Sequence, residues 1–174
     1  MAPHFYLDDP EERELYFDMV KELVTKYKND ERICIWDVYN EPGNSKRTPV
    51  APALLQRMFD TVRACNPSQP LTCAVWECGN YMKGGDENPF KEIERIIFEN
   101  SDILSYHFYG GYNEHIKIIK RLKQEGRPIL NTEWLGRCTG NDVFTCFPLF
   151  YLEKIGCYNW GFVAGKYQSY EPWE

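Results

Sequence analysis

The sequence predicts an α/β domain in which parallel strands alternate with helices that cover them. Short apolar runs, rich in β-branched and aromatic residues, begin near residues 33, 71, 102, 128 and 157. Between them lie segments whose apolar residues recur at helical spacing. A strand that starts roughly every thirty residues is typical of βα units, which build a parallel sheet. The chain has 174 residues and no obvious linker, so residues 1–174 are expected to form a single domain.

Five helices are expected from the apolar periodicity, and their ends carry recognisable signals. At the first helix, Asp9 can act as the cap, Pro10 suits the first turn, and Glu12 is placed for a capping box. Gly126 ends the fourth helix, and Pro148 should kink or split the fifth. The predicted helices span residues 10–27, 48–65, 89–98, 113–125 and 142–155.

Two of the five predicted strands end close to a glutamate. The first strand runs toward Glu41, where Pro42 and Gly43 stop it, and the fourth runs into Glu133. Folds of this class keep their chemistry at the carboxyl ends of the strands. Two glutamates there, in a chain with 16% aromatic residues, suggest glycoside hydrolysis by a pair of carboxylates. The predicted strands span residues 33–39, 71–76, 102–107, 128–132 and 157–163.

The composition argues against several classes of function. A net charge of −6 without a basic run disfavours nucleic acid or an anionic membrane as partner, and no apolar stretch approaches transmembrane length. No glycine-rich phosphate loop follows a strand, so we expect no dinucleotide and no other cofactor. The seven cysteines are odd in number and lack the spacing of a zinc site. We interpret them as mostly buried free thiols, which favours a reducing compartment, and we expect no metal site.

Two motifs then carry a resemblance to a known family. Trp36-Asp37-Val38-Tyr39-Asn40-Glu41-Pro42 resembles the fourth-strand signature of clan A glycoside hydrolases, the retaining (β/α)8-barrel enzymes that include cellulases, xylanases and β-mannanases. Asn131-Thr132-Glu133-Trp134 is similar to the seventh-strand signature of the same family. The resemblance implies that Glu41 is the general acid/base, that Asn40 binds the sugar 2-hydroxyl, and that Glu133 is the nucleophile. It covers only strands four to eight, so we expect a partial TIM-type (β/α) barrel with about five parallel strands.

Further positions fit the same family. Ser105-Tyr106-His107-Phe108-Tyr109 resembles the sixth strand, which implies that His107 and Tyr109 line the site and that either could hydrogen-bond the nucleophile. Asn159-Trp160-Gly161 resembles the eighth strand, whose tryptophan forms the floor under the reacting sugar. Trp76 and Trp134 are expected as additional aromatic surfaces, because sugar rings stack on such side chains through their apolar faces.

Structural roles are the alternative for several of these residues. Glu133 could cap the helix that follows it, and His107 could be a hydrogen-bonded core histidine. Trp76 could belong to the core, and Trp160 fits a core role as well as a sugar-binding role. His115 lies in a polar helical segment and is expected at the surface.

The expected partial barrel raises a geometric problem. Neighbouring strands are about 4.8 Å apart, so Glu41 and Glu133, three strands apart, would be separated by about 14 Å in a flat sheet. Retaining hydrolysis needs carboxyl groups about 5 to 5.5 Å apart. Only curvature of the sheet could bring the two together. The open sheet would also expose two edges, which favours self-association as a homo-oligomer.

Three functions remain open at this stage. The leading hypothesis is a retaining glycosidase that cleaves β-1,4-linked plant polysaccharide, of the xylanase or endoglucanase type. The alternative is a catalytically inactive barrel fragment that binds glycan or assembles with a partner. A third reading is a metal-dependent lyase or isomerase in which Glu41, Glu77 and Glu133 hold Mg²⁺. The chain start lacks signal-peptide features, which favours the cytoplasm for the chain as it stands, whereas members of the family are often exported.

Overall fold

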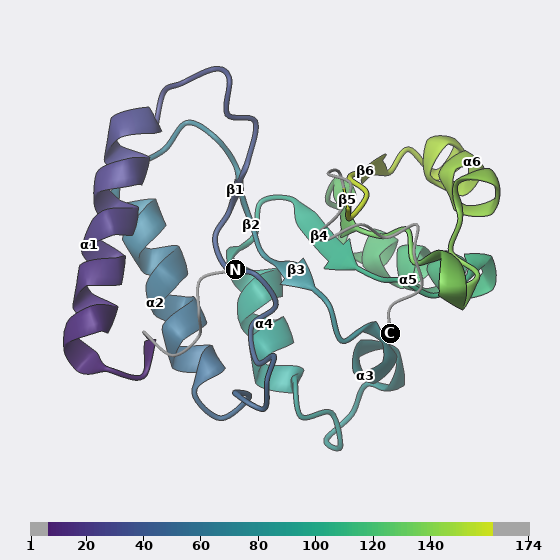
Figure 1. Cartoon of the computed structure of the whole chain (residues 1–174), viewed down its shortest axis with the longest axis horizontal. Coiled ribbons are helices and arrows are strands. Elements are labelled where there is room, and N and C mark those ends of the chain that lie inside the picture. Colours follow the sequence, from purple (N-terminus) through teal and green to yellow (C-terminus); the bar gives the residue numbers. More distant parts are fainter. Residues whose placement is uncertain (1–6, 162–174) are drawn as a thin grey trace.

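The computed structural model describes residues 7–161, the side chain of Cys138 apart (Figure 1). Its helices and strands alternate along most of the chain, as the sequence predicts. The helices are α1 (Pro10–Tyr27), α2 (Ala51–Ala64), α3 (Cys78–Lys83), α4 (Lys91–Asn100), α5 (Tyr112–Leu122) and α6 (Val143–Glu153). The strands are β1 (Trp36–Asp37), β2 (Leu71–Thr72), β3 (Ala74–Val75), β4 (Leu104–His107), β5 (Ile129–Glu133) and β6 (Gly156–Cys157). Two 3₁₀ turns follow α5 and β5, at Lys123–Glu125 and Arg137–Thr139.

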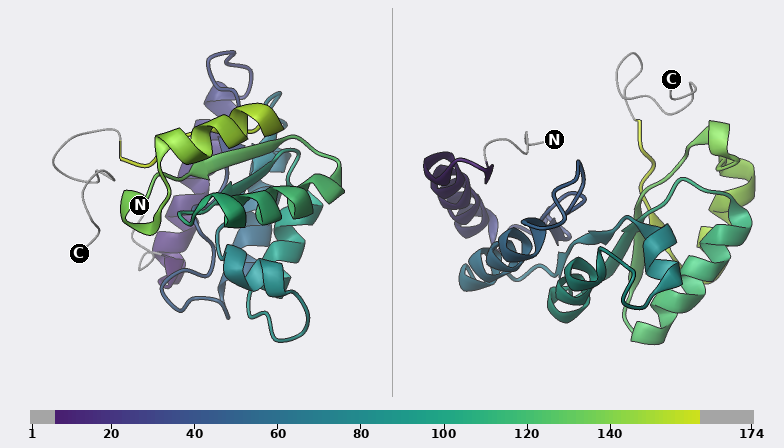
Figure 2. Two further views of the ribbon diagram at one scale, coloured as in Figure 1. Left: turned by 90° about the vertical axis from the view of Figure 1, so that its right-hand side faces the viewer. Right: turned by 90° about the horizontal axis from the view of Figure 1, so that it is seen from below.

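All strand pairs are parallel. β1 pairs with β2, and β3, β4, β5 and β6 form a second ladder in that order. Only Cys73 separates β2 from β3, so the two are successive parts of one extended segment. The result is five parallel segments side by side, which confirms the predicted α/β class. Figure 2 shows that the helices follow one another along the outside of this curved sheet.

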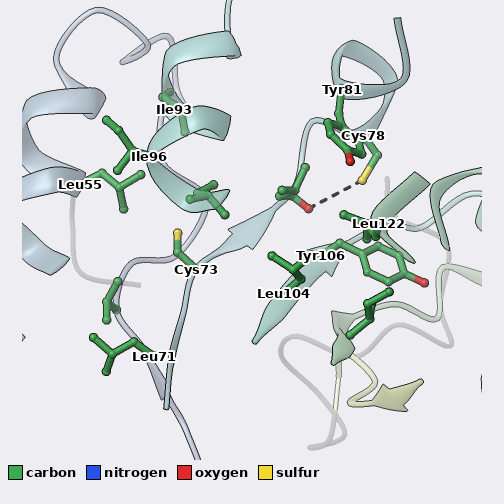
Figure 3. Packing of buried hydrophobic residues seen from close by; sticks show 14 of the residues in the cluster. Leu55, Leu71, Cys73, Cys78, Tyr81, Ile93, Ile96, Leu104, Tyr106 and Leu122 are labelled. Carbon is green, nitrogen blue, oxygen red and sulfur yellow. Dashed lines mark hydrogen bonds between the residues drawn. The ribbon is translucent and has the colours of Figure 1, made fainter. Parts of the chain in front are cut away.

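The core lies between the sheet and the helices. The apolar residues that recur at helical spacing along α2 are buried, and strand residues such as Leu71, Leu104 and Tyr106 meet α2 and its neighbouring helices from the sheet side (Figure 3). Four of the six cysteines described as free thiols are buried, and Cys73 and Cys78 belong to this core. Cys34, by contrast, is exposed. Among residues 7–161, no helix is long and apolar enough to cross a membrane.

Several helix predictions agree with the structure at their ends. Asp9 caps α1, because its side chain accepts hydrogen bonds from the backbone N–H groups of Glu11 and Glu12. Pro148 does not split α6, which runs through it. The short helix α3 was not expected from the sequence. The apolar residues of α1 are only partly buried in the core: Phe17 and Val24 are buried, whereas Leu15, Met19 and Leu23 are exposed.

The first and the last strand differ most from the prediction. The first predicted strand, residues 33–39, is reduced to Trp36–Asp37, because β1 pairs only with β2 and its other edge has no strand partner among the described residues. The last, predicted for residues 157–163, is seen as Gly156–Cys157, and residues 162 and 163 lie outside the described part. The expectation that His115 lies at the surface was wrong: its side chain is fully buried beneath α5.

Candidate active site

Glu41 lies in a tight turn after β1. Its backbone has φ +47°, a left-handed conformation that non-glycine residues rarely adopt, and Gly43 has φ +86°. A Cβ atom on Gly43 would lie 2.8 Å from Ile93 Cδ1, so glycine is needed for space as well as for conformation. The indole N–H of Trp76 donates to the carbonyl oxygen of Pro42 over 2.9 Å. Backbone conformations of this kind persist where the surroundings enforce them, often at functional sites.

Glu133 is the last residue of β5 and receives a hydrogen bond from the neighbouring strand end. Tyr109 OH donates to Glu133 Oε2 over 2.8 Å. Burial, and in second place its hydrogen bond to Glu133, raises the pKa of Tyr109 far above its usual range. Tyr109 therefore remains a neutral donor to this carboxylate at any pH at which proteins are stable.

His107 lies between the two glutamates. Its Nδ1 is 3.0 Å from Glu41 Oε1 and 3.5 Å from Glu133 Oε2. The histidine side chain is 4% exposed and the two carboxylates 16% and 17%, so all three are shielded but can be reached from solvent. A register shift between β4 and β5 at Tyr106/His107 pairs His107 with Glu133, which turns the imidazole toward the carboxylates.

The two glutamates come together across the sheet. One oxygen from each, together with His107 Nδ1, forms a group of atoms within 4.8 Å of one another. A flat sheet would separate the glutamates by about 14 Å. The sheet is therefore curved, and a cavity of about 390 Å³ on its inner side has walls from the first and second strand segments and from the last two. Its lining residues are Arg32, Ile33, Cys34, Ile35, Asp37, Thr72, Leu130, Thr132 and Tyr158.

Two polar residues of the site were not predicted. Asn44 Nδ2 donates to Glu41 Oε2 over 2.6 Å. Asp37 is an exposed residue of β1 that lines the inner cavity. Desolvation at the cavity wall raises the pKa of Asp37 to about 6; the interaction with His107 and a backbone hydrogen bond from Tyr39 oppose the shift, and the charge of Glu133 adds to it.

The predicted sugar-binding residues fall into two groups. Asn40 is exposed, and Trp76 and Trp160 are partly exposed, so all three present surface near the ends of the strands. Trp134 does not: it is 3% exposed and packs edge-on against Phe150 with ring centroids 5.0 Å apart. The prediction that Trp134 contacts a glycan is therefore wrong for this structure. Alternation along the strand explains the error, because the residue after Glu133 points to the helix side.

The three-carboxylate metal reading does not fit this geometry. Glu77 precedes α3, and its carboxylate accepts a hydrogen bond from Asn80 Nδ2 over 3.2 Å. Within residues 7–161, the residues whose ligating atoms converge are Glu41, His107 and Glu133, so a cation could be held only there. Two of these three side chains, Glu41 and Glu133, form the carboxylate pair, and His107 can donate a hydrogen bond to Glu41.

Comparison with known proteins agrees with the fold and the motifs. The family model described as Cellulase (glycosyl hydrolase family 5) matches residues 2–163. No curated protein matches the chain. Among solved structures, a β-mannanase from Streptomyces thermolilacinus with mannohexaose is similar at a TM-score of 0.64 and 17% identity, over 88% of this chain and 54% of the other.

Two further structures show the same fold. A β-mannanase from Thermomonospora fusca gives a TM-score of 0.62 at 14% identity, over 88% of this chain and 55% of that one. A glycosylated endo-β-1,4-xylanase of family 10 from Gloeophyllum trabeum gives 0.53 at 18% identity, over 72% and 43%. The chain thus spans about half the length of these enzymes, and at such identities the likeness establishes the fold alone.

Proposed function

Because the chain belongs to the cellulase family, glycosyl hydrolase family 5, we propose that it is a glycosidase that cleaves β-linked glycans with retention of configuration. The observation that carries the proposal is the approach of Glu41 and Glu133, whose facing oxygens belong to a group of atoms within 4.8 Å. This spacing suits a nucleophile and an acid/base on opposite sides of one glycosidic bond, whereas inverting enzymes separate their carboxyl groups by about 6.5–9.5 Å to admit a water.

In the first step, Glu133 attacks the anomeric carbon and forms a glycosyl ester. Glu41 gives its proton to the glycosidic oxygen as the bond to the leaving sugar breaks. The hydrogen bond from Tyr109 keeps one oxygen of Glu133 occupied and so orients the other. In the second step, Glu41 takes a proton from water, the resulting hydroxide attacks the anomeric carbon, and Glu133 leaves as the carboxylate.

His107 is suited to follow the movement of charge during these steps. Negative charge leaves Glu133 when the ester forms and develops on Glu41 when that residue loses its proton. An imidazole N–H donates to one acceptor at a time, and Nδ1 is closer to Glu41 than to Glu133. We therefore assign His107 the stabilisation of the Glu41 carboxylate after proton transfer.

The proposed substrate is a β-1,4-linked plant polysaccharide, with xylan and cellulose as first candidates. Mannan joins them, because similar solved structures are described as β-mannanases, one of them with mannohexaose. Asn40 at the exposed rim would bind the sugar 2-hydroxyl, and Trp160 and Trp76 would offer aromatic surfaces to sugar rings.

The test is release of reducing sugar from xylan, carboxymethylcellulose and mannan. The wild type should release sugar from at least one of them, and Glu133→Ala should release none. Glu77→Gln serves as the matched control, since it changes a partly buried strand-end glutamate outside the pair. Retained hydrolysis by Glu133→Ala would refute the assignment. The stereochemistry of the first product, followed by NMR, distinguishes retention from inversion.

A second candidate is glycan binding without cleavage, either alone or after assembly with a partner. The observation that favours it is the cavity on the inner side of the sheet, because a closed barrel fills this space with side chains from further strands. Calorimetric binding of cellohexaose, xylohexaose or mannohexaose, with no hydrolysis by wild type, would select this candidate.

A further inference from the structure

A buried polar cluster lies behind the carboxylate pair, on the helix side of the sheet. Its centre is His115 of α5, which is fully buried. Its Nδ1 is 3.1 Å from Tyr106 OH, and its Nε2 is 2.8 Å from Asn141 Nδ2. The aromatic rings of Phe108 and Phe150 pack edge-on against the imidazole at 5.0 Å. A buried histidine with a partner at each nitrogen is an ordered group.

The contacts of Asn141 determine which nitrogen of His115 carries the proton. Asn141 Oδ1 accepts a hydrogen bond from the backbone N–H of Leu135 over 3.0 Å, which fixes the orientation of the amide. Its Nδ2 then faces His115 and the carbonyl oxygens of Phe108 and Gly110. An amide nitrogen has no lone pair to offer, so His115 Nε2 must accept, and Nδ1 bears the hydrogen that is donated to Tyr106. Burial lowers the pKa of His115 to about 4, in keeping with a neutral ring.

Asn141 joins the two loops that carry the site. The carbonyl oxygens it binds belong to the residues on either side of Tyr109. Asn141 Oδ1 accepts from the backbone N–H of Leu135, which lies two residues after Glu133. Leu135 has a φ of +84°, which is unusual for leucine. Thr139 adds a hydroxyl donor to the carbonyl oxygen of Tyr109. The buried amide of Asn141 therefore links the loop that carries Tyr109 to the loop after Glu133, beside the backbone hydrogen bond from Phe108 N–H to the carbonyl oxygen of Glu133.

We propose that Asn141 and His115 are positioning residues that fix Tyr109 against Glu133, with His115 held as the neutral Nδ1–H tautomer. Asn141 is the bridge between the loops, and His115 orients Asn141 by accepting its second amide hydrogen. In its effect on catalysis, the inference rests on the proposed glycosidase function. Its structural content, the tautomer and the linked loops, does not.

The first experiment is ¹⁵N NMR of the wild-type histidines at neutral pH. The chain has three histidines, so the spectrum is simple. We expect His115 to give the signal of a neutral Nδ1–H ring, recognised because it disappears in His115→Phe; His107 can carry a proton on Nδ1 as well, so the variant makes the assignment. Assignment of the Nε2–H tautomer to His115 would overturn the inference.

The second experiment compares variants by hydrogen exchange and kinetics. Asn141→Asp puts an oxygen against two carbonyl oxygens and His115 Nε2, so the Leu135 amide should exchange faster, and kcat should fall about 10²-fold with little change in KM. His115→Phe should also lower kcat and speed exchange of the Leu135 amide. His115→Gln should lower kcat less than His115→Phe, because the glutamine amide oxygen can accept from Asn141 Nδ2. Asn66→Asp, the same charge change at an exposed turn, is the control.

The outcomes separate the two proposals. Unchanged Leu135 exchange in both Asn141→Asp and His115→Phe would overturn the positioning role, whatever the activity. If Asn141→Asp does not fold, the proposal is still tested by the tautomer of His115 in the wild type and by the difference in Leu135 exchange and kcat between His115→Gln and His115→Phe. A wild type that shows the expected tautomer and exchange but hydrolyses no glycan would support the linked loops and reject only the catalytic function.

Discussion

Trp76 donates its indole N–H to the carbonyl oxygen of Pro42, the residue directly after Glu41. This bond connects the loop after β3 to the turn after β1, so the end of one strand segment holds the turn that carries Glu41 on the neighbouring segment. Trp76 also packs edge-on against Phe90, and Phe90 and Ile93 in turn lie against Gly43. The placement of Glu41 therefore depends on packing that lies outside its own strand.

Gly43→Ala tests this dependence. The substitution adds a Cβ atom that would lie 2.8 Å from Ile93 Cδ1, at a φ of +86°. We expect unfolding free energy to fall by about 1–3 kcal/mol, measured by urea denaturation, and activity to fall further as Glu41 is displaced. Gly79→Ala is the matched control, because no atom lies within 4 Å of the added Cβ. Equal stability of the two variants would contradict the packing argument.

Tyr109→Phe removes the donor to Glu133 but keeps the ring. We expect kcat to fall about 10²-fold, the typical effect of losing one aligned donor in a catalytic site. Thermal unfolding should change little, because Tyr109 is only partly buried. Steady-state kinetics on an aryl glycoside measures the effect, and a kcat within twofold of wild type would mean that the hydrogen bond plays no part in turnover.

Asp37 should make the protein less stable as the pH rises through its titration range. Its pKa is raised from 3.8 to about 6 in the folded chain, mainly by desolvation at the cavity wall, so between these values the unfolded chain releases the proton first. Stability contributed by the protonated form is complete below about pH 4 and lost above about pH 6. Asp37→Asn should raise the melting temperature at pH 7.5 and leave it unchanged near pH 3.5. The exposed Asp18→Asn should show no such difference, and an effect independent of pH would contradict the assignment.

Self-association through the exposed flanks stays a proposal. Within residues 7–161, β1 and β6 each have one edge without a strand partner. In addition, α1 exposes Leu15, Met19 and Leu23, and α6 exposes Phe144 (91%) and Tyr151 (79%). Parallel sheets are usually covered on both faces, so we propose that copies of the chain associate through these surfaces. Light scattering at micromolar concentration should give a mass above that of the monomer, reduced in a Phe144→Asp, Tyr151→Asp double variant. A sharp monomer would refute the proposal.

Local patterns in the sequence were sufficient to predict the parallel α/β fold and the strand ends that carry Glu41 and Glu133. The approach of these glutamates was not predictable in this way, because it depends on curvature accumulated over several strands. The burial of His115 was predictable in principle. It precedes Ile118, Ile119 and Leu122 by three, four and seven residues, which places it on the buried stripe of α5. The charged residues around it masked this periodicity.

Tyr106 and His107 are neighbours in β4 but belong to different polar systems. Tyr106 faces the buried side and contacts His115, whereas His107 faces the glutamates. β4 therefore separates two groups of polar side chains. The carboxylates beside His107 can be reached from solvent, whereas Tyr106 and His115 are fully buried. In the proposed reaction, charge that moves between Glu41 and Glu133 would be separated by the strand from the imidazole of His115, so the geometry of the loops need not change with each step.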